Sequence, residues 1–414
     1  MNQVWVKKSQ DKLKEEVFKA LEENVSYIDK SILGVPASYL NDKVFNQDVA
    51  FLKDAPFLSA LVQNPNHIGC HTLGKSESFF TGTHAIEKEL IEICAVDILK
   101  GEAGAQDGYI ASGGTEANIQ AIWIYRNYFQ QKLNAQQNEI AIICSEDSHY
   151  SMDKASNLLS VALYKFLVNP EDRTVEKELL KKTIALAKAD GKKYFIFVAN
   201  MMTTMFGSVD DIELIVEVLK EEGVEFKIHV DGAYGGFYYP FSNEESVLTF
   251  NNLAISSFTL DAHKMAQSPY GTGIFLIRKG LIQYANTKEA SYVEGEDFTL
   301  IGSRSGANAI AVWMILCKNG PFGWYEKIFI LQKRAEWLSK QLDKLTIEYY
   351  RNPFSNIITI KSDSIEQHLA EKYYLVPDNH AKPKWYKVVI MEHVTVDLLI
   401  LLVEDITKSS QKKY

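Results

Sequence analysis

Lys264 is the residue whose setting in this sequence most strongly suggests covalent chemistry. It closes the run Asp261-Ala262-His263-Lys264, which follows an apolar segment at residues 255–260. A lysine amine that is held beside an aldehyde can form a Schiff base with it. Most lysines are exposed residues in loops, so this interpretation depends on the other residues that accompany Lys264.

The second feature is a glycine turn, Ser112-Gly113-Gly114-Thr115, which precedes a segment of helical periodicity. Glycines let a backbone approach a ligand closely, and the N-terminus of the following helix offers N–H groups and a positive dipole end to an anion. The Thr115 hydroxyl adds a donor. Alone, the turn is more typical of an ordinary strand–turn–helix junction with a threonine cap.

Asp231 and His149 are the remaining two features, and each follows an apolar segment. A carboxylate in that position is poorly solvated, so Asp231 needs a partner, and a protonated pyridine nitrogen is a suitable one. The imidazole of His149 can stack on a flat heteroaromatic ring. Separately, Asp231 also fits a turn cap and His149 a surface histidine. Glycine turn, histidine, aspartate and lysine in this order predict a site for pyridoxal 5′-phosphate (PLP).

The elements that must position these residues are short apolar segments that alternate with helices. Strands are predicted at 109–112, 140–144, 194–199, 226–230, 255–260 and 273–277, and helices at 86–99, 115–129, 175–189 and 211–222. Strands that are apolar throughout predict an α/β fold with a mostly parallel central sheet that helices cover on both faces. Ligands bind at the carboxyl ends of the strands in such sheets.

The two ends of the chain have a different character. Residues 9–30 predict an amphipathic helix, because Leu13, Val17 and Leu21 recur every four residues. Residues 281–300 are polar and predict a loop. After them come predicted helices at 307–318, 324–345 and 395–406 and strands at 356–360 and 386–391. We therefore expect an N-terminal helical arm (1–60), a large PLP-binding domain (61–300) and a small C-terminal α+β domain (301–414).

Composition excludes several classes of protein. The chain has 414 residues and a net charge of −9, which argues against nucleic acid as a partner. No apolar stretch is long enough for a membrane span, and the first residues lack the apolar region of a signal peptide. The four cysteines show no C-x-x-C spacing, so we expect buried, reduced thiols, no metal site and a cytoplasmic location.

Over nearly its whole length the chain resembles the fold-type I, group II PLP-dependent amino-acid decarboxylases. The matching runs are residues 64–67, 82–87, 112–121, 203–210, 231–235, 261–265, 302–306 and 385–394. The Gly-Ser-Arg-Ser-Gly run at 302–306 is most similar to the archaeal-type tyrosine or aspartate decarboxylases. Sphingosine-phosphate lyases share some of these motifs, so a PLP-dependent carbon–carbon lyase is an alternative. A PLP-binding protein without turnover is a further one.

The resemblance implies a role for each matching residue. The cofactor-binding residues would be Gly113, Gly114, Thr115, His149, Thr204, Asp231, Ala233, Asp261, His263 and Lys264. Lys264, His149 and Asp231 would also be catalytic, with Tyr292 the best candidate for the proton donor. Arg304 and His84 would bind the substrate, although Arg304 also fits a structural salt bridge. Met201 and Met202 stand where the family commonly has Ala-Gly, which implies a different pocket wall.

The implied reaction converts an L-amino acid to its amine and carbon dioxide through the Lys264 Schiff base. The implied assembly is a homodimer with the active site at the subunit interface, and we expect the helix at 9–30 to cross between subunits. Tyrosine, aspartate, glutamate, histidine and diaminobutyrate all remain open as substrates.

Overall fold

A seven-stranded sheet forms the centre of the protein in this computed structural model, which describes residues 4–25, 40, 45, 49–70, 72, 73, 77–285 and 296–411. Across the sheet the order is β2 (Gln106–Ala111), β8 (Gly273–Arg278), β7 (Ile255–Asp261), β6 (Glu225–Gly232), β5 (Tyr194–Asn200), β3 (Ile140–Ser145) and β4 (Ala162–Phe166). Strands β7, β6, β5, β3 and β4 are parallel to one another. Strand β8 is antiparallel to both β2 and β7, so it is the one strand of this sheet that runs opposite to the rest. The predicted α/β fold with a mostly parallel sheet is confirmed.

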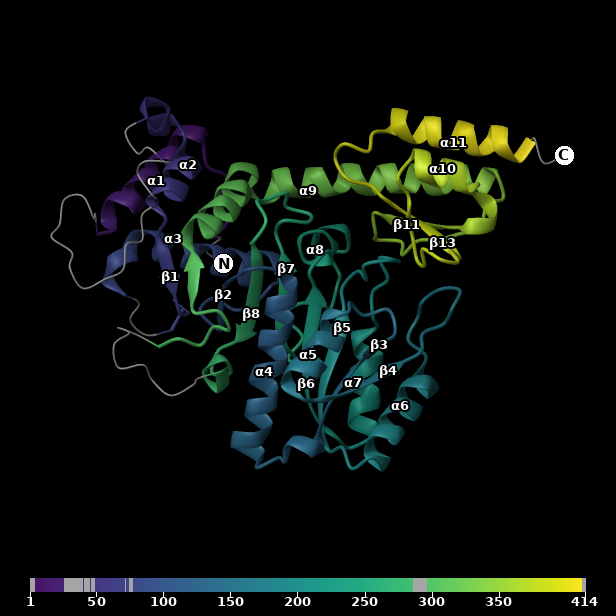
Figure 1. Cartoon of the computed structure of the whole chain (residues 1–414), viewed down its shortest axis with the longest axis horizontal. Helices are drawn as coiled ribbons and strands as arrows, with labels where there is room; N and C mark the ends of the chain where they lie inside the picture. The colour runs from purple at the N-terminus through teal and green to yellow at the C-terminus, as the bar shows by residue number, and fades with distance from the viewer. Residues whose placement is uncertain are drawn as a thin grey trace.

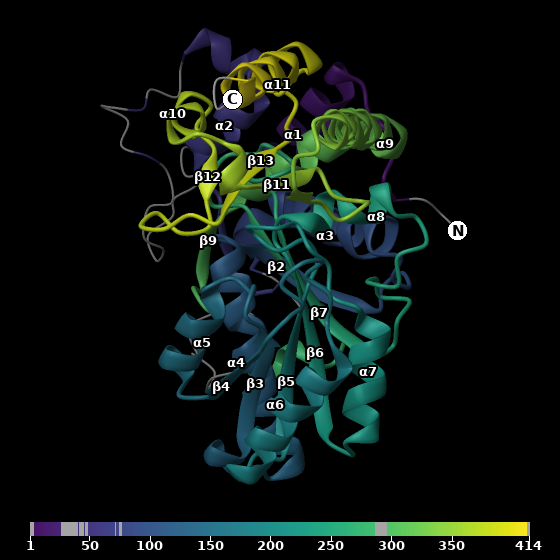
Figure 2. The ribbon, with the colours of Figure 1, turned by 90° about the vertical axis from the view of Figure 1, so that its right-hand side faces the viewer.

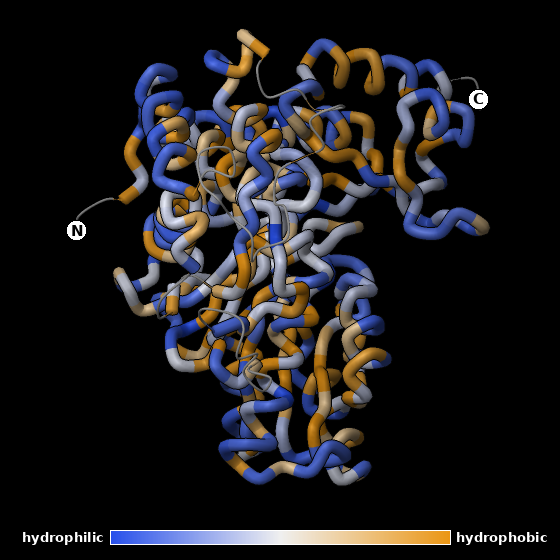
Figure 3. The backbone as a smooth tube through the Cα atoms, turned by 60° about the vertical axis from the view of Figure 1, so that its left-hand side comes forward, coloured by the Kyte–Doolittle hydropathy of each residue, from blue (hydrophilic) through white to orange (hydrophobic). Residues whose placement is uncertain are grey.

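Helices cover both faces of this sheet (Figure 2). α4 (Gly114–Leu133) and α5 (Ser151–Leu159) pack on one face, and α6 (Lys177–Ala189) and α7 (Ile212–Glu221) pack on the other. Strand β3 supplies both cores, because Ile142 and Cys144 contact the first while Ala141 and Ile143 contact the second. The hydrophobic colour therefore follows the central strands in Figure 3. The sequence prediction missed α5 and β4.

The long helix α9 (Gly306–Lys344) runs past the end of the sheet to a second, smaller sheet (Figure 1). It bends at Gly320, whose φ of 67° and following Pro321 interrupt the helical backbone, and this break separates the two helices that the sequence predicts. The smaller sheet has the order β10 (Tyr349–Tyr350), β11 (Ile357–Lys361), β13 (Trp385–Val389) and β12 (Val376–Pro377), with α10 (Gln367–Lys372) and α11 (Val396–Gln411) beside it.

Helix α1 (Gln10–Glu23) is shorter than the predicted helix at 9–30, whose residues 26–30 lie outside the described part of the chain. Its apolar stripe is buried within its own chain, where it packs against α3 (Thr81–Glu92) and α9; Leu13 is 1% exposed and Val17 0%. The chain itself covers this stripe, and the expectation that the helix crosses to another subunit stays a prediction. No described helix combines the length and the apolar character that crossing a membrane requires.

Short elements complete the described chain. They are η1 (Ala50–Asp54), α2 (Pro56–Gln63), β1 (Asn66–Ile68), η2 (Ser78–Phe80), η3 (Ile93–Ile98, a π-helical turn), η4 (Gln137–Glu139), η5 (Gly235–Phe237), α8 (Tyr239–Ser242), η6 (Ile282–Ala285), β9 (Ser303–Ser305) and η7 (Ser362–Ser364). Strands β1 and β9 pair with each other and bring residues 66–68 against residues 303–305.

Candidate active site

The sheet register brings the four predicted features to one edge. Ala111 and Asp261 both pair with Gly273, so the ends of β2 and β7 lie on either side of the start of β8. Asn200 pairs with Asp231 at the ends of β5 and β6. The glycine turn, Asp231 and the lysine segment therefore meet at the carboxyl edge of the sheet, where ligands bind in α/β folds.

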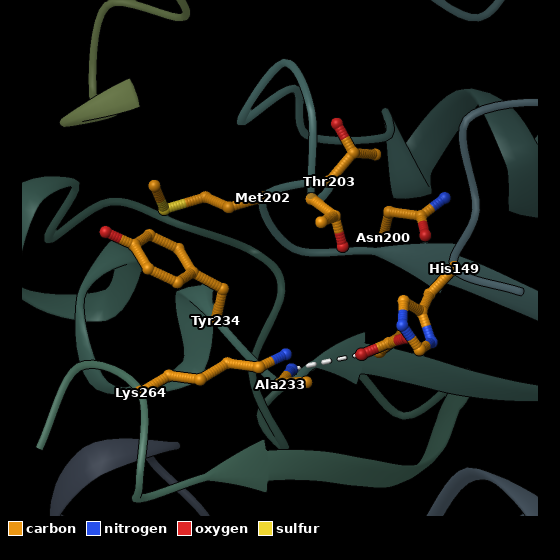
Figure 4. Close-up of a pocket in the computed structure, with 9 residues that line it drawn as sticks. His149, Asn200, Met202, Thr203, Ala233, Tyr234 and Lys264 are labelled. Carbon is orange, nitrogen blue, oxygen red and sulfur yellow. Dashed lines mark hydrogen bonds between the residues drawn. The ribbon is translucent and has the colours of Figure 1, made fainter. Parts of the chain in front are cut away.

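Two adjoining hollows lie at this edge, and they share His149, Ala233 and Lys264. The larger is a cavity of about 330 Å³ lined by Ser112, Gly113, Gly114, Thr115, Glu116, Asn118, His149, Tyr150, Ala233, Asp261, His263 and Lys264. The smaller is lined by His149, Asn200, Met202, Thr203, Thr204, Asp231, Ala233, Tyr234 and Lys264. Figure 4 shows Met202, Tyr234 and Lys264 on one side of the smaller hollow and Asn200 and His149 on the other.

The backbone packs closely at two glycines around the turn, and glycine is required at the first of them. A Cβ atom at Gly273 would lie 2.4 Å from the carbonyl carbon of Gly113, so glycine lets the turn rest directly on β8. A Cβ at Gly114 would lie 3.1 Å from Cβ of Ala233 and 3.2 Å from Oδ2 of Asp261. The start of α4, which is 20 residues long, therefore stays open to a ligand, and its dipole favours an anion there.

Asp261 connects this turn to the lysine segment. Its Oδ2 accepts a hydrogen bond of 3.1 Å from the Gly114 N–H and lies 3.9 Å from Nζ of Lys264. Its Oδ1 lies 2.7 Å from Nδ1 of His263, an ion-pair distance without hydrogen-bond alignment. Burial raises the pKa of Asp261, and the neighbouring charges of Lys264 and His263 oppose that shift. Burial is the larger of these effects.

Asp231 presents a buried carboxylate whose two oxygens each accept one hydrogen bond. Asn118 Nδ2 donates to Oδ2 at 2.9 Å, and the Ala233 N–H donates to Oδ1 at 3.0 Å, as the dashed line in Figure 4 marks. The side chain is 8% exposed. One lone pair on each oxygen remains for a further donor, so the carboxylate fits a protonated pyridine nitrogen.

His149 lies at the junction of both hollows. The Ser151 N–H donates to Nδ1 at 3.2 Å, so a neutral ring carries its proton on Nε2. Burial lowers the pKa of His149, although the charge of Asp231 acts in the opposite direction. The Tyr150 ring lies 4.1 Å from the imidazole, centroid to centroid. A neutral, flat ring held from behind is suited to stacking on a cofactor.

These residues fit pyridoxal phosphate. The open start of α4 matches the phosphate, the buried carboxylate of Asp231 matches the ring nitrogen, and His149 and Ala233 both border the space between them. The Lys264 amine borders the same space and can reach an aldehyde. The lining chemistry therefore agrees with the cofactor that the sequence predicts.

Arg304 lies apart from this cavity, in a buried cluster at the edge of the sheet. Its guanidinium forms an ion pair with Glu87 and donates to the Ile110 carbonyl at 3.0 Å, while the Ile110 N–H donates to Oε1 of Glu87 at 2.9 Å. The pair thus satisfies the outer backbone groups of edge strand β2, just before the glycine turn. Arg304 also lines a hollow of about 150 Å³ that includes Ser112. Its role in substrate binding stays a prediction.

The two other predicted site residues are placed differently. His84 is 2% exposed and packs its ring 4.5 Å from that of His67, and it lines none of the hollows described above. Its substrate role also stays a prediction. Tyr292 lies outside the described residues.

Several residues at this edge were not singled out from the sequence. They are Asn118, Ser151, Asn200, His229 and Tyr234, whereas Met202, which the sequence placed in a pocket wall, does line the smaller hollow. For two of them the sequence spacing could have predicted a place in the site. Asn118 lies four residues after Gly114 and so faces the same side of α4, and His229 lies two residues before Asp231 on the same face of β6.

Comparison with known proteins agrees with this site. The model of the pyridoxal-dependent decarboxylase conserved domain matches residues 69–351. A tryptophan decarboxylase of Clostridium sporogenes is 48% identical over 409 residues, which are 99% of this chain and 98% of that protein. A probable L-tyrosine/L-aspartate decarboxylase of Methanocella arvoryzae is 30% identical over 374 residues, 86% of this chain and 94% of that protein.

Solved structures have the same fold. L-methionine decarboxylase of Streptomyces sp. 590 superposes with a TM-score of 0.68 at 19% identity, covering 95% of this chain and 93% of its own. Sphingosine-1-phosphate lyase of Burkholderia pseudomallei superposes with a TM-score of 0.68 at 18% identity, covering 79% of this chain and 77% of its own. At these identities the likeness concerns the fold alone, and it is the fold-type I architecture that the sequence predicts. The family model matches more than half of the chain, including the residues that line the cofactor cavity. This chain therefore belongs to the pyridoxal-dependent decarboxylase family and is a PLP-dependent amino-acid decarboxylase.

Proposed function

We propose that this decarboxylase acts on an aromatic L-amino acid, with tryptophan as the preferred substrate. The observation that carries the proposal is the 48% identity to a tryptophan decarboxylase over 99% of the chain, against 30% to a probable tyrosine/aspartate decarboxylase. Tryptophan is not among the substrates that the sequence motifs suggested, because the motifs describe the cofactor and not the side-chain pocket.

The pocket wall beside Lys264 supports an aromatic substrate. Met202 and Tyr234 contribute a thioether and a phenol ring to the smaller hollow, and both group types pack well against aromatic rings. Met202 has φ 69°, a conformation that is strained for a residue with a side chain. Met202 is assigned to the pocket wall because it lines the smaller hollow together with Lys264.

We assign the chemistry to three side chains. PLP, when bound through its aldehyde to the Lys264 amine, supplies an electron sink for the pair released as carbon dioxide departs. Asp231 keeps a proton on the ring nitrogen by its charge. His149, which lines the cavity, holds the ring by stacking, and its Nε2–H is a donor. Lys264 accepts and returns a proton at Nζ as substrate enters and amine leaves.

The carbon–carbon lyase alternative has weaker support. Its structural representative shares only the fold with this chain, at 18% identity, whereas the decarboxylases among the curated relatives reach 48%. Phosphoethanolamine as a product would favour the lyase. Tryptamine and carbon dioxide in equal amounts from tryptophan would support the proposal, and their absence with every aromatic amino acid would contradict it.

We further propose a homodimer with the cavity at its interface. Tyr150 and Tyr270 are 58% and 86% exposed, and their rings pack in tilted pairs against His149 and His263, which line the cavity. Exposed aromatic rings at an active-site mouth are typical of surfaces that another chain covers. Light scattering should give twice the chain mass, and Tyr270→Arg should shift the protein toward monomer with loss of activity. A fully active monomer would contradict the dimer. A cytoplasmic location stays a prediction.

A further inference from the structure

A chain of buried polar side chains leads to Asp231 from within the sheet. His229 is 0% exposed, with Nε2 2.9 Å from Oδ1 of Asn118 and Nδ1 2.7 Å from Oγ of Ser257. Asn118 Nδ2 in turn donates to Oδ2 of Asp231 at 2.9 Å, and the Tyr125 hydroxyl is hydrogen-bonded to Ser257. His229 is thus linked to the Asp231 carboxylate through a single amide.

The Asp231 carboxylate determines the direction of every hydrogen bond in this series of side chains. An ionised Asp231 can only accept, so the Asn118 amide nitrogen faces it and the amide oxygen faces His229. That oxygen can only accept, so His229 carries its proton on Nε2. Nδ1 then accepts from the Ser257 hydroxyl, and the Tyr125 hydroxyl donates to Ser257. If donor and acceptor were exchanged in any of these hydrogen bonds, a buried acceptor in the series would lack a donor.

The charge state of His229 agrees with this order. Burial lowers its pKa to about 4, despite the opposing charge of Asp231, so the ring is neutral at neutral pH. A neutral imidazole has one donor and one acceptor, as the chain requires. The Thr259 hydroxyl lies 3.1 Å from Nε2 and shares that side of the ring with Asn118.

We propose that His229 is a positioning residue, which fixes the Asn118 amide and through it the orientation of the Asp231 carboxylate toward the cofactor ring. The same amide donates to Ser151 Oγ at 2.9 Å, and Ser151 Oγ lies 2.9 Å from Nδ1 of His149. One amide therefore holds the groups on two sides of the ring. The inference rests on the proposed pairing of Asp231 with the ring nitrogen.

The first test needs no cofactor. Nitrogen NMR of ¹⁵N-histidine-labelled, cofactor-free protein should show His229 as the neutral tautomer with its proton on Nε2, unchanged from pH 8 down to about pH 5. His229→Gln identifies the signal by removing it. A proton on Nδ1, or a charged ring at pH 7, would overturn the inference.

The second test compares three variants of the PLP-loaded enzyme. His229→Phe removes the donor to Asn118, His229→Gln keeps an amide donor, and Thr259→Val removes only the side contact. We expect His229→Phe to lower kcat about 100-fold with KM within about threefold, because a carboxylate displaced by less than 1 Å no longer meets the ring nitrogen. It should also shift the pH at which the visible absorbance of the bound cofactor changes. His229→Gln should recover at least about tenfold of kcat, and Thr259→Val should match wild type.

Wild-type kinetics and an unshifted absorbance titration in His229→Phe would overturn the inference. Equal defects in His229→Phe and His229→Gln would do so too, because both would then report packing alone. If His229→Phe does not fold, Ser257→Ala replaces it, and its absorbance titration should shift in the same direction by a smaller amount. If wild-type protein releases no carbon dioxide from any amino acid, the proposed function fails, whereas a shifted titration in His229→Phe would still support the positioning role.

Discussion

The Gly114 N–H donates a 3.1 Å hydrogen bond to Oδ2 of Asp261, and this bond joins two segments that lie 147 residues apart. Gly114 opens the helix at the end of the site that we assign to the phosphate, and Asp261 lies 3.9 Å from the Lys264 amine, which we assign to the aldehyde. The distance between the two ends is therefore set by one buried carboxylate. The site depends on close backbone contact as much as on the reactive groups.

Gly114→Ala should weaken cofactor binding. The added Cβ would lie 3.1 Å from Cβ of Ala233 and 3.2 Å from Oδ2 of Asp261, so these neighbours must move by a few tenths of an ångström. We expect the PLP dissociation constant to rise about tenfold or more, as measured by absorbance titration. Gly323→Ala is the matched control, because its nearest neighbour is Asn319 Cβ at 4.0 Å, and helix propensity should make it neutral or slightly stabilising. Unchanged PLP affinity in Gly114→Ala would contradict the close fit.

Lys264→Ala should abolish both turnover and the visible absorbance of the lysine-bound cofactor. The variant should still bind PLP reversibly, because the phosphate and ring contacts remain. Spectra before and after dialysis test this, with the exposed Lys382→Ala as the control that keeps both properties. A Lys264→Ala protein that still releases carbon dioxide and keeps its visible band would remove Lys264 from the mechanism.

Asp231→Ala should reduce kcat by at least about 100-fold while some PLP stays bound, because Asp231 is the carboxylate that we assign to the ring nitrogen. Retention of PLP is expected, since the glycine turn, His149 and Lys264 are unchanged. Steady-state kinetics with a parallel PLP assay separates the two effects. Wild-type kcat in this variant would exclude the electron-sink role.

Arg304→Met should destabilise the protein by about 3–5 kcal/mol, because the buried Glu87 carboxylate loses the guanidinium and keeps the contacts with the His67 ring and the Ile110 N–H. Adding Glu87→Gln removes that charge and keeps an acceptor for the Ile110 N–H, so the double variant should recover about half of the loss. Urea unfolding measures both, and a double variant as unstable as the single one would contradict the prediction. If Arg304 also binds the substrate carboxylate, KM in the folded double variant should rise about tenfold or more.

Lowering the pH should reduce the free energy of unfolding of the cofactor-free protein, because the unfolded chain binds a proton at His229. Burial lowers its folded pKa from 6.5 to about 4, so between these values the unfolded chain binds the extra proton and stability falls as pH falls. From pH 6.5 to 5 this amounts to about 2 kcal/mol, which His229→Gln should not show. Burial raises the pKa of Asp210 to about 7, so this group makes stability rise as pH falls. Its effect is the same in wild type and in His229→Gln. Parallel pH dependence of the two unfolding midpoints would refute the prediction.

The sequence was sufficient for the parts of the site that follow strand ends. The positions of Asp231 and Lys264 could be predicted because each directly follows an apolar strand and the carboxyl ends of parallel strands share one edge. The cofactor followed from residue types alone. The central sheet was also predictable, since its strands are apolar throughout.

The network behind Asp231 could not be read from the sequence in the same way. Asn118 and His229 are 111 residues apart, and their contact depends on how α4 crosses β6. Arg304 illustrates the reverse case, because a charged residue in a family motif turned out to satisfy the edge of β2. The backbone of Met202 in the wall of the smaller hollow is left-handed, and no sequence motif predicts that conformation.

The central claim is tested most directly by incubating purified, PLP-loaded protein with single amino acids and measuring carbon dioxide and amine together. The panel is tryptophan, tyrosine, phenylalanine, aspartate, glutamate, histidine and diaminobutyrate, with amines identified by mass spectrometry. We predict tryptamine and carbon dioxide in a one-to-one ratio, with kcat/KM for tryptophan at least about tenfold above that for any other member. Turnover of aspartate or glutamate without turnover of tryptophan would contradict the proposed substrate, and loss of tryptophan without carbon dioxide would contradict decarboxylation itself.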